Sequence, residues 1–147
     1  GVEGKLDTIV QYPDVVVPFV HTVGLNLSNG KMVINVSEII DIASLNISLV
    51  AFANETNSQN NIRLSGAIVY LEDSNLVTII LTESQRVKAI ESSGTPGGDN
   101  NAIFATIEKG AFQDYGRNFV GLNANLVVLE IPDTELPRLL NASVDEL

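Results

Sequence analysis

Residues 23–37 read VGLNLSNGKMVINVS and decide the class of fold. Apolar side chains occupy every second position on both sides of Asn29-Gly30, which is the period of a strand with one buried face. An Asn-Gly pair between two alternating runs is the strongest short-range signal for a β-hairpin. The stretch therefore predicts two antiparallel strands joined by a tight turn, with Leu25 and Ile34 pointing into a core.

Further runs of the same kind follow along the chain. Alternation over residues 45–49 and apolar segments within 65–71, 76–81, 102–107 and 122–131 predict more strands, because turn-rich stretches separate them. Residues 82–85 have the spacing of a capping box and predict one short helix over residues 83–90. About seven short strands with turn signals between them are typical of an all-β fold, a β-sandwich. The expected core consists of Leu25, Leu27, Ile34, Val36, Leu45, Ile47, Leu49, Val77, Ile79, Leu81, Ile107 and Leu126.

Two hexapeptides, residues 13–18 and 132–137, share the pattern Pro-Asp-x-x-x-Pro at a spacing of 132 − 13 = 119 residues. Their neighbours correspond as well, since Val20 aligns with Leu139 and Leu25 with Val144. Repetition at a fixed spacing is typical of tandem arrays. We therefore expect residues 1–12 to end a preceding repeat, 13–131 to form one module, and 132–147 to contain a joint and the first strand of the next repeat.

Prolines limit backbone freedom, so such joints favour a semi-rigid, extended row of modules. The residues expected to form the joints are Pro13, Asp14, Pro18, Pro132, Asp133 and Pro137.

Composition excludes several classes of protein. The 147 residues carry 18 acids against 8 bases, a net charge of −10 and a pI of about 4.3, so the chain repels phosphate backbones and nucleic acid is not an expected partner. Mean hydropathy of +0.22 indicates a globular chain. No apolar run reaches the roughly 18 residues of a membrane span. The chain has no cysteine, which excludes disulfides and thiol chemistry.

Five Asn-x-Ser/Thr sequons point to an extracellular or cell-surface location, because this motif accepts N-glycans in secreted proteins. A second interpretation stays open: residues i and i+2 share a face of a strand, so a polar outer face rich in Asn and Ser produces sequons by itself. The candidate acceptors are Asn26, Asn35, Asn46, Asn54 and Asn141.

Four motifs occur in order along the chain: VSEIIDIASLN at 36–46, VTIILTESQR at 77–86, DYGRN at 114–118 and PDTELP at 132–137. They resemble the F-S-E-x-V-D-x-x-S-L strand, the V-x-I-x-L-T-x-x-D strand and helical turn, the D-x-x-G-N corner and the P-D-T-x-x-P joint of Ig-like repeats in large secreted and surface proteins. The chain departs from this pattern at Val36 (usually aromatic), at Gln85 (often an acid) and at Asn118, which follows one extra residue. The resemblance implies an Ig-like β-sandwich and a structural or adhesive role without catalysis.

Catalytic signatures are weak. His21 is the one histidine, and no Gly-x-Ser-x-Gly elbow accompanies it as Ser-His-Asp catalysis would require. The glycine-rich stretch 94–98 lacks the Lys-Ser/Thr of a phosphate loop. Acidic residues near the joints and the 114–118 corner could instead supply oxygens to calcium, and the candidate ligands are Asp114, Asp133, Glu135 and Asp145.

These observations favour a non-catalytic structural repeat of an extracellular filament, stalk or adhesin, N-glycosylated and joined to neighbouring modules of the same protein as a homopolymer or filament. No cofactor is required, and calcium is the one candidate. The alternative is a calcium-dependent adhesion or carbohydrate-binding module, for which Tyr70 and Tyr115 are the candidate stacking residues. A hydrolase is a third and weaker alternative.

Overall fold

The computed structural model describes residues 16–53, 61–96, 98 and 102–133. Strands dominate this part of the chain, with one α-helix and two short 3-10 turns. The strands are β2 (Val20–Asn26), β3 (Lys31–Asp41), β4 (Val50–Ala53), β5 (Ile62–Arg63), β6 (Ile68–Val69), β7 (Ser74–Ile80), β8 (Phe104–Ile107), β9 (Gln113–Asp114) and β10 (Asn123–Ile131). The helix is α1 (Glu83–Glu91), and the 3-10 turns are η1 (Ile42–Ser44) and η2 (Ile47–Leu49). The all-β prediction is confirmed.

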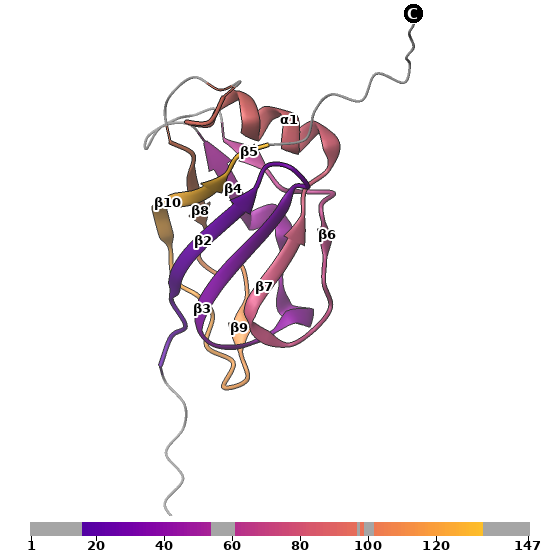
Figure 1. The fold of residues 1–147 in the computed structure, drawn as a ribbon. Helices are drawn as coiled ribbons and strands as arrows, with labels where there is room; N and C mark the ends of the chain where they lie inside the picture. Colours follow the sequence, from indigo (N-terminus) through magenta and orange to yellow (C-terminus); the bar gives the residue numbers. More distant parts are fainter. Residues whose placement is uncertain (1–15, 54–60, 97, 99–101, 134–147) are drawn as a thin grey trace, which may run out of the picture.

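Hydrogen bonds connect the strands into one continuous sheet (Figure 1). Its order is β5-β4-β8-β10-β2-β3-β7-β6, and β9 pairs with the far end of β3. β10 is the connecting strand, because it pairs in parallel with β2 and antiparallel with β8. The other strand pairs within the described residues are antiparallel.

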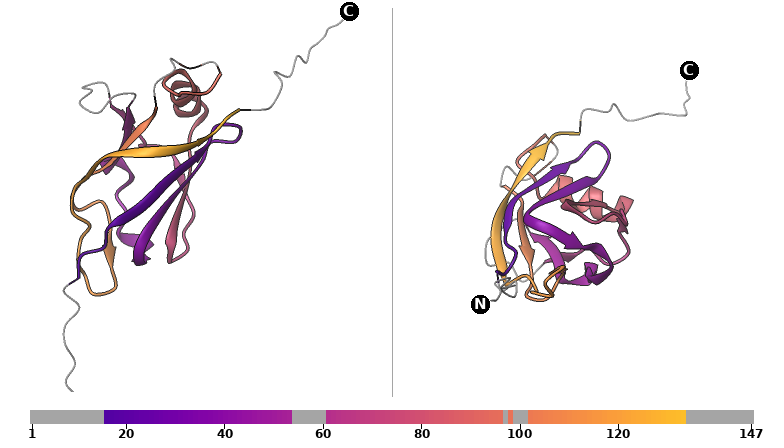
Figure 2. Two further views of the ribbon diagram at one scale, coloured as in Figure 1. Left: turned by 60° about the vertical axis from the view of Figure 1, so that its left-hand side comes forward. Right: turned by 90° about the horizontal axis from the view of Figure 1, so that it is seen from below.

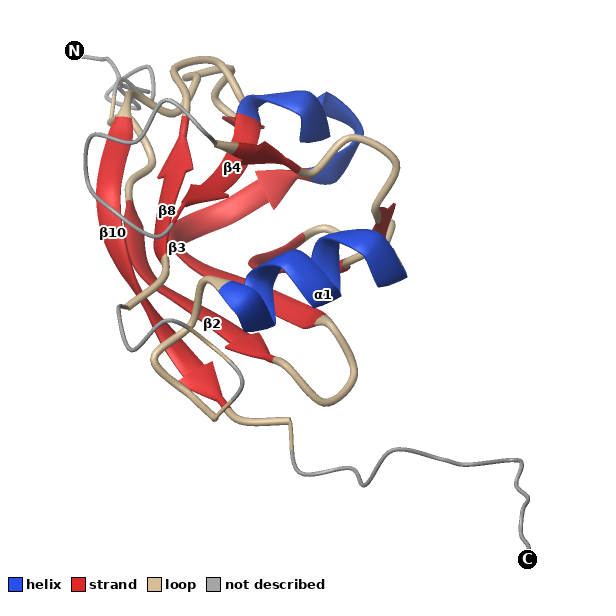
Figure 3. Cartoon of the chain, turned by 90° about the horizontal axis from the view of Figure 1, so that it is seen from above, coloured by secondary structure: helices blue, strands red, loops and turns tan. Residues whose placement is uncertain are grey.

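The sheet curls around its core, and α1 lies over one end of the curl (Figures 2 and 3). Of the twelve predicted core residues, eight are buried: Leu25, Leu27, Ile34, Val36, Val77, Ile79, Leu81 and Ile107. The other four are half-buried and pack against the core: Leu45, Ile47, Leu49 and Leu126. Each fully buried aliphatic or aromatic side chain contributes on the order of 1.5–3 kcal/mol to folding, so the burial of these residues is a main source of stability for the curled sheet.

The hairpin predicted from residues 23–37 is confirmed. β2 and β3 pair antiparallel with Val23 opposite Ile34 and Leu25 opposite Met32. The turn between them requires a left-handed residue, and Gly30 supplies it with φ +73°.

The predicted strand over residues 45–49 is wrong. The 3-10 turn η2 occupies residues 47–49, a second one, η1, ends just before at Ser44, and the next strand begins only at Val50. The cause is local: the side-chain oxygen of Asn46 accepts hydrogen bonds from the backbone N–H and the hydroxyl of Ser48, at 3.1 and 2.6 Å. Such side-chain bonds give the backbone an alternative to strand pairing. Leu45, Ile47 and Leu49 still pack on the core, because the turns point their apolar sides inward.

The predicted helix over residues 83–90 is confirmed, and so is its capping box. Thr82 accepts from the backbone of Gln85, and the Gln85 side chain accepts from the backbone of Thr82. Gln85 is buried and its amide nitrogen also donates to the carbonyls of Arg63 and Ser65. A carboxylate cannot donate these bonds, which explains why glutamine replaces the acid of the resembling pattern. None of the helical residues placed by the structure belongs to a helix with the length and apolarity of a membrane span.

Candidate functional site

Arg86 on α1 lies at the end of the fold where β10 finishes and contacts residue 133 beyond it. Its guanidinium donates to both carboxylate oxygens of Glu83, at 3.0 and 2.9 Å, and to the carbonyl of Leu27 at 2.7 Å. It also contacts Asp133 at 3.3 Å. The hydrogen bonds from Arg86 lower the pKa of Glu83, and the same bonds raise the pKa of Arg86. One side chain therefore holds the helix, the β2–β3 turn and the exit segment together.

Two further bonds fix the exit segment to the same turn. The backbone N–H of Leu27 donates to the carbonyl of Ile131 at 2.8 Å, and the Ser28 hydroxyl donates to the carbonyl of Pro132 at 3.2 Å. Three consecutive residues, 131–133, are thus anchored. The predicted joint residue Pro137 lies outside the described residues.

The entry end shows a similar attachment. Pro18 is buried, and the next residue, Phe19, exchanges hydrogen bonds with Ser37: its N–H donates to the hydroxyl and its carbonyl accepts the N–H. The ring of Phe19 meets His21 edge-on with centroids 4.7 Å apart. His21 is exposed beside this aromatic ring, as a surface histidine. Pro13 and Asp14 lie outside the described residues.

The 114–118 corner closes on itself. Asp114 is only 2% exposed, and its carboxylate accepts the backbone N–H of Asn118 at 2.9 Å, with the Asn118 amide nitrogen 3.3 and 3.4 Å from the two oxygens. Asn118 is four positions after Asp114, the same spacing as in the D-x-x-G-N pattern, so no residue is inserted between them. Arg117 stands at the glycine position of that pattern and adopts φ 66°, a left-handed conformation that costs a non-glycine residue about 1–2 kcal/mol.

A neighbouring bond ties this corner to the loop before β7. The Tyr115 hydroxyl donates to the carboxylate of Asp73, whose other oxygen accepts the backbone N–H of Ile42 at 2.9 Å. The bond to Tyr115 is the main cause that lowers the pKa of Asp73, and the bond to Asp73 raises the pKa of Tyr115. Tyr115 and Tyr70, the two tyrosines considered for sugar stacking, are 62% and 50% exposed.

The four candidate calcium ligands are not assembled within the described residues. Asp114 pairs with Ile40 at one end of β3, whereas Asp133 lies beyond β10 near the other end, where Lys31 pairs with Asn26. Nine residues of strand at about 3.3 Å each separate these ends by roughly 30 Å. Glu135 and Asp145 lie outside the described residues, and the part of the chain that is described contains no group of three potential metal ligands.

The sequon asparagines differ in exposure. Asn46 is exposed at the start of η2, whereas Asn26 and Asn35 are half-buried on the outer face of β2 and β3. Asn54 and Asn141 lie outside the described residues.

Glu130 on β10 accepts hydrogen bonds from residues near both ends of the loop between α1 and β8. Its two carboxylate oxygens accept the backbone N–H groups of Gly94 at 3.0 Å and Ile103 at 2.8 Å. These two hydrogen bonds could not be predicted from the sequence, because Gly94 and Ile103 are 36 and 27 residues away from Glu130.

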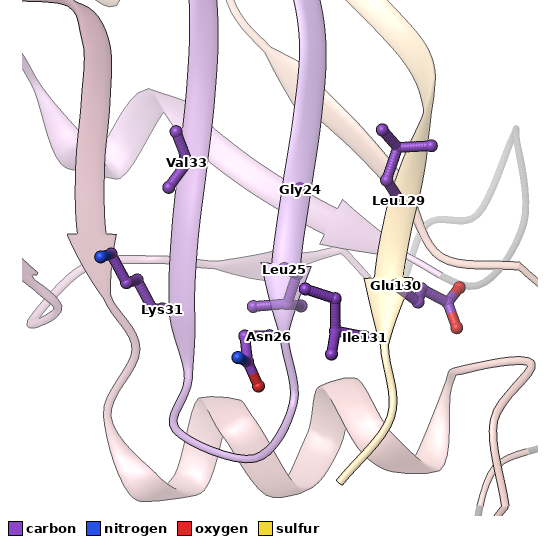
Figure 4. Close-up of a pocket in the computed structure, with 8 residues that line it drawn as sticks. All are labelled: Gly24, Leu25, Asn26, Lys31, Val33, Leu129, Glu130 and Ile131. Carbon is purple, nitrogen blue, oxygen red and sulfur yellow. The ribbon is translucent and has the colours of Figure 1, made fainter.

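A shallow hollow of about 410 Å³ on the outer face of β10, β2 and β3 was also not anticipated (Figure 4). It forms because Gly24 has no side chain between Leu129 and Val33, with which it is in register. Its rim is partly apolar, since Leu129 and Ile131 are 60% and 54% exposed. The sequence carries no clear signal for this hollow, because residues 126–129 are all apolar and do not show which side chains face outward.

Comparison of the chain with protein-family models, with curated proteins and with solved structures yields no match.

Proposed function

We propose that this chain is a non-catalytic structural repeat of an extracellular filament, stalk or adhesin, built from Ig-like modules that follow one another through proline-containing joints. The observation that carries the proposal is the parallel pairing of β10 with β2. Because the two strands run in the same direction, the chain enters beside the start of β2 and leaves beyond the end of β10, at opposite ends of the module (Figure 1). Termini at opposite ends allow modules to follow one another head to tail, each in contact with its neighbours.

The strand order supports the Ig-like description. If the sheet is divided between β2 and β10, one half reads β2-β3-β7-β6 and the other β10-β8-β4-β5. In chain order these are the ABED and GFC arrangements of an Ig sandwich, with one added edge strand. The curl of the sheet brings the inner faces of the two halves onto a common core.

The burial pattern of β2 supports the repeat of 119 residues. Val20, Val23 and Leu25 are buried, whereas Thr22 is exposed. The residues 119 positions later are Leu139, Ala142, Val144 and, for the exposed position, Asn141. These four positions agree in polarity, whereas Leu140 corresponds to the exposed His21 and Glu146 to the buried Leu27, so residues 138–147 match this strand in part.

Glycosylation is the second part of the proposal. Among the described sequons, Asn46 is the best acceptor, because its side chain is exposed on a turn and not on a paired strand. Production in a secreting eukaryotic cell, followed by peptide mass spectrometry, tests this. A glycan on Asn46 that disappears in Asn46→Gln supports the extracellular assignment, and an unmodified Asn46 contradicts it.

A two-copy protein tests the repeat itself. The protein consists of residues 1–147 followed directly by residues 29–133, so that residue 147 takes the place of residue 28, since 147 − 119 = 28. The β2 strand of its second module must therefore come from residues 138–147. We expect two folded modules in an elongated particle by small-angle scattering and electron microscopy. The control is residues 1–137 followed by 19–133, which keeps the original β2 sequence. If only the control folds its second module, the proposed repeat is wrong.

A further inference from the structure

Several hydrogen bonds at the end of the module where the chain leaves converge on the residues that follow β10. We propose that Arg86 acts as a clamp that fixes the direction in which the chain leaves one module and enters a second copy, so that the angle between neighbours is set by the fold. This inference rests on the proposed function, because it assumes that another module follows.

Several bonds converge on the clamp. Four contacts use Arg86: two oxygens of Glu83, the carbonyl of Leu27 and the carboxylate of Asp133. The Arg86 side chain is 20% exposed and that of Asp133 is 26% exposed, so this contact is partly shielded from solvent. Glu83 is 73% exposed, and its pair with Arg86 therefore adds little stability. Its effect is to orient the guanidinium, because a planar fork held on one side presents its remaining N–H groups in a fixed direction.

The aliphatic stem of Arg86 lies against the turn between β2 and β3. Gly30 adopts φ +73°, and a Cβ built there would lie 3.5 Å from the Cδ of Arg86. The arginine stem thus passes directly over the turn. The turn also binds the exit chain itself, through Leu27 to Ile131 and through Ser28 to Pro132.

These contacts also constrain a neighbouring module, because the next residue expected to be anchored, Pro137, follows soon after Asp133. In the repeat of 119 residues, Pro137 corresponds to Pro18, which is buried in its own module. Only three residues, 134–136, separate the anchored Asp133 from that position. Four Cα–Cα steps span at most about 14 Å, so consecutive modules must lie nearly in contact. Losing the Asp133 anchor lengthens the unanchored segment and frees the angle between them.

The first experiment uses the 147-residue chain and ¹⁵N relaxation. We expect the Asp133 amide to have an order parameter near 0.85 in the wild type, and below about 0.6 in Arg86→Ala. Lys88→Ala is the matched control, since it removes the same charge from an exposed position of the same helix. Arg86→Lys keeps the charge and the aliphatic stem but not the fork, so it should also raise mobility if Arg86→Ala proves too unstable to measure. A wild-type Asp133 amide below about 0.6, or one unchanged by both Arg86 variants, overturns the proposal.

The second experiment uses the two-copy protein described above. The chain has no cysteine, so Lys109→Cys in both copies allows two spin labels at equivalent exposed positions. We expect a narrow distance distribution that broadens with Arg86→Ala in the first copy and stays narrow with Lys88→Ala there. Equal widths in all three proteins contradict the clamp but leave the repeat intact. A second copy that fails to fold contradicts the repeat, and the Asp133 measurement on the single chain still tests the anchor.

Discussion

Replacing the buried Asp114 should destabilise the module more than any exposed acid. Asp114→Ala removes the acceptor of the Asn118 backbone N–H, a full hydrogen bond at 2.9 Å, and of the longer amide contacts at 3.3 and 3.4 Å. A hydrogen bond to a charged group contributes about 1.5–3 kcal/mol. Asn118 is half-buried, so water satisfies its N–H only in part. We therefore expect a loss of about 2–3 kcal/mol, mostly from the backbone bond.

The assay is urea denaturation followed by far-ultraviolet circular dichroism, with unchanged m-values as evidence that the variants unfold in the same way. Asn118→Ala should cost less than Asp114→Ala, because it retains the backbone N–H that donates to the Asp114 carboxylate. Glu72→Ala, an exposed acid in a nearby loop, is the control and should stay within about 0.5 kcal/mol of the wild type. If Asp114→Ala costs no more than Glu72→Ala, the corner is not held by this carboxylate and our reasoning is refuted.

Three further outcomes follow from the other contacts. Glu130→Ala should destabilise the chain by about 2 kcal/mol in the same assay, because it removes the acceptor of two backbone amides. The exposed Glu91→Ala is the control and should not destabilise the chain. Equal effects of the two substitutions would argue against the bonds to Glu130. Since its bond to Tyr115 lowers the pKa of Asp73, the stability from this bond should be present above the ordinary carboxyl pKa and be lost as pH falls below about 4. Tyr115→Phe should flatten that acid limb, and an unchanged pH profile of the melting temperature would count against the bond. Addition of about 1 mM calcium should leave the melting temperature of the 147-residue chain unchanged, because the described candidate ligands lie at opposite ends of β3; a clear rise would favour the calcium-dependent alternative.

Local signals in the sequence predicted local structure well. The Asn29-Gly30 hairpin and the capping box around Thr82 were both confirmed, because each depends on residues within one turn of chain. The wrong prediction at residues 45–49 also has a local cause. Alternation there predicts a strand, but the side-chain hydrogen bonds between Asn46 and Ser48 favour a 3-10 turn.

Long-range partners could not be predicted. The parallel pairing of β10 with β2 joins residues about a hundred positions apart, and alternation alone does not say which strands become neighbours. The contacts of Arg86 with Leu27 and Asp133 could not be predicted either, since these residues are 59 and 47 positions away in the sequence. The repeated Pro-Asp-x-x-x-Pro pattern predicts a joint at residues 132–137, but it does not indicate that Arg86 contacts Asp133.

The pairing of β10 with β2 also determines how the module should respond to a pull. A stretching force applied through its two ends acts along both strands, and it draws β2 and β10 past each other in opposite directions. The residue pairs from Val128–Val23 to Ile131–Asn26 are then loaded together in shear and must yield almost at once. Forced unfolding depends on the height of that barrier more than on equilibrium stability, so a thread of such units would resist tension even where each unit is only modestly stable.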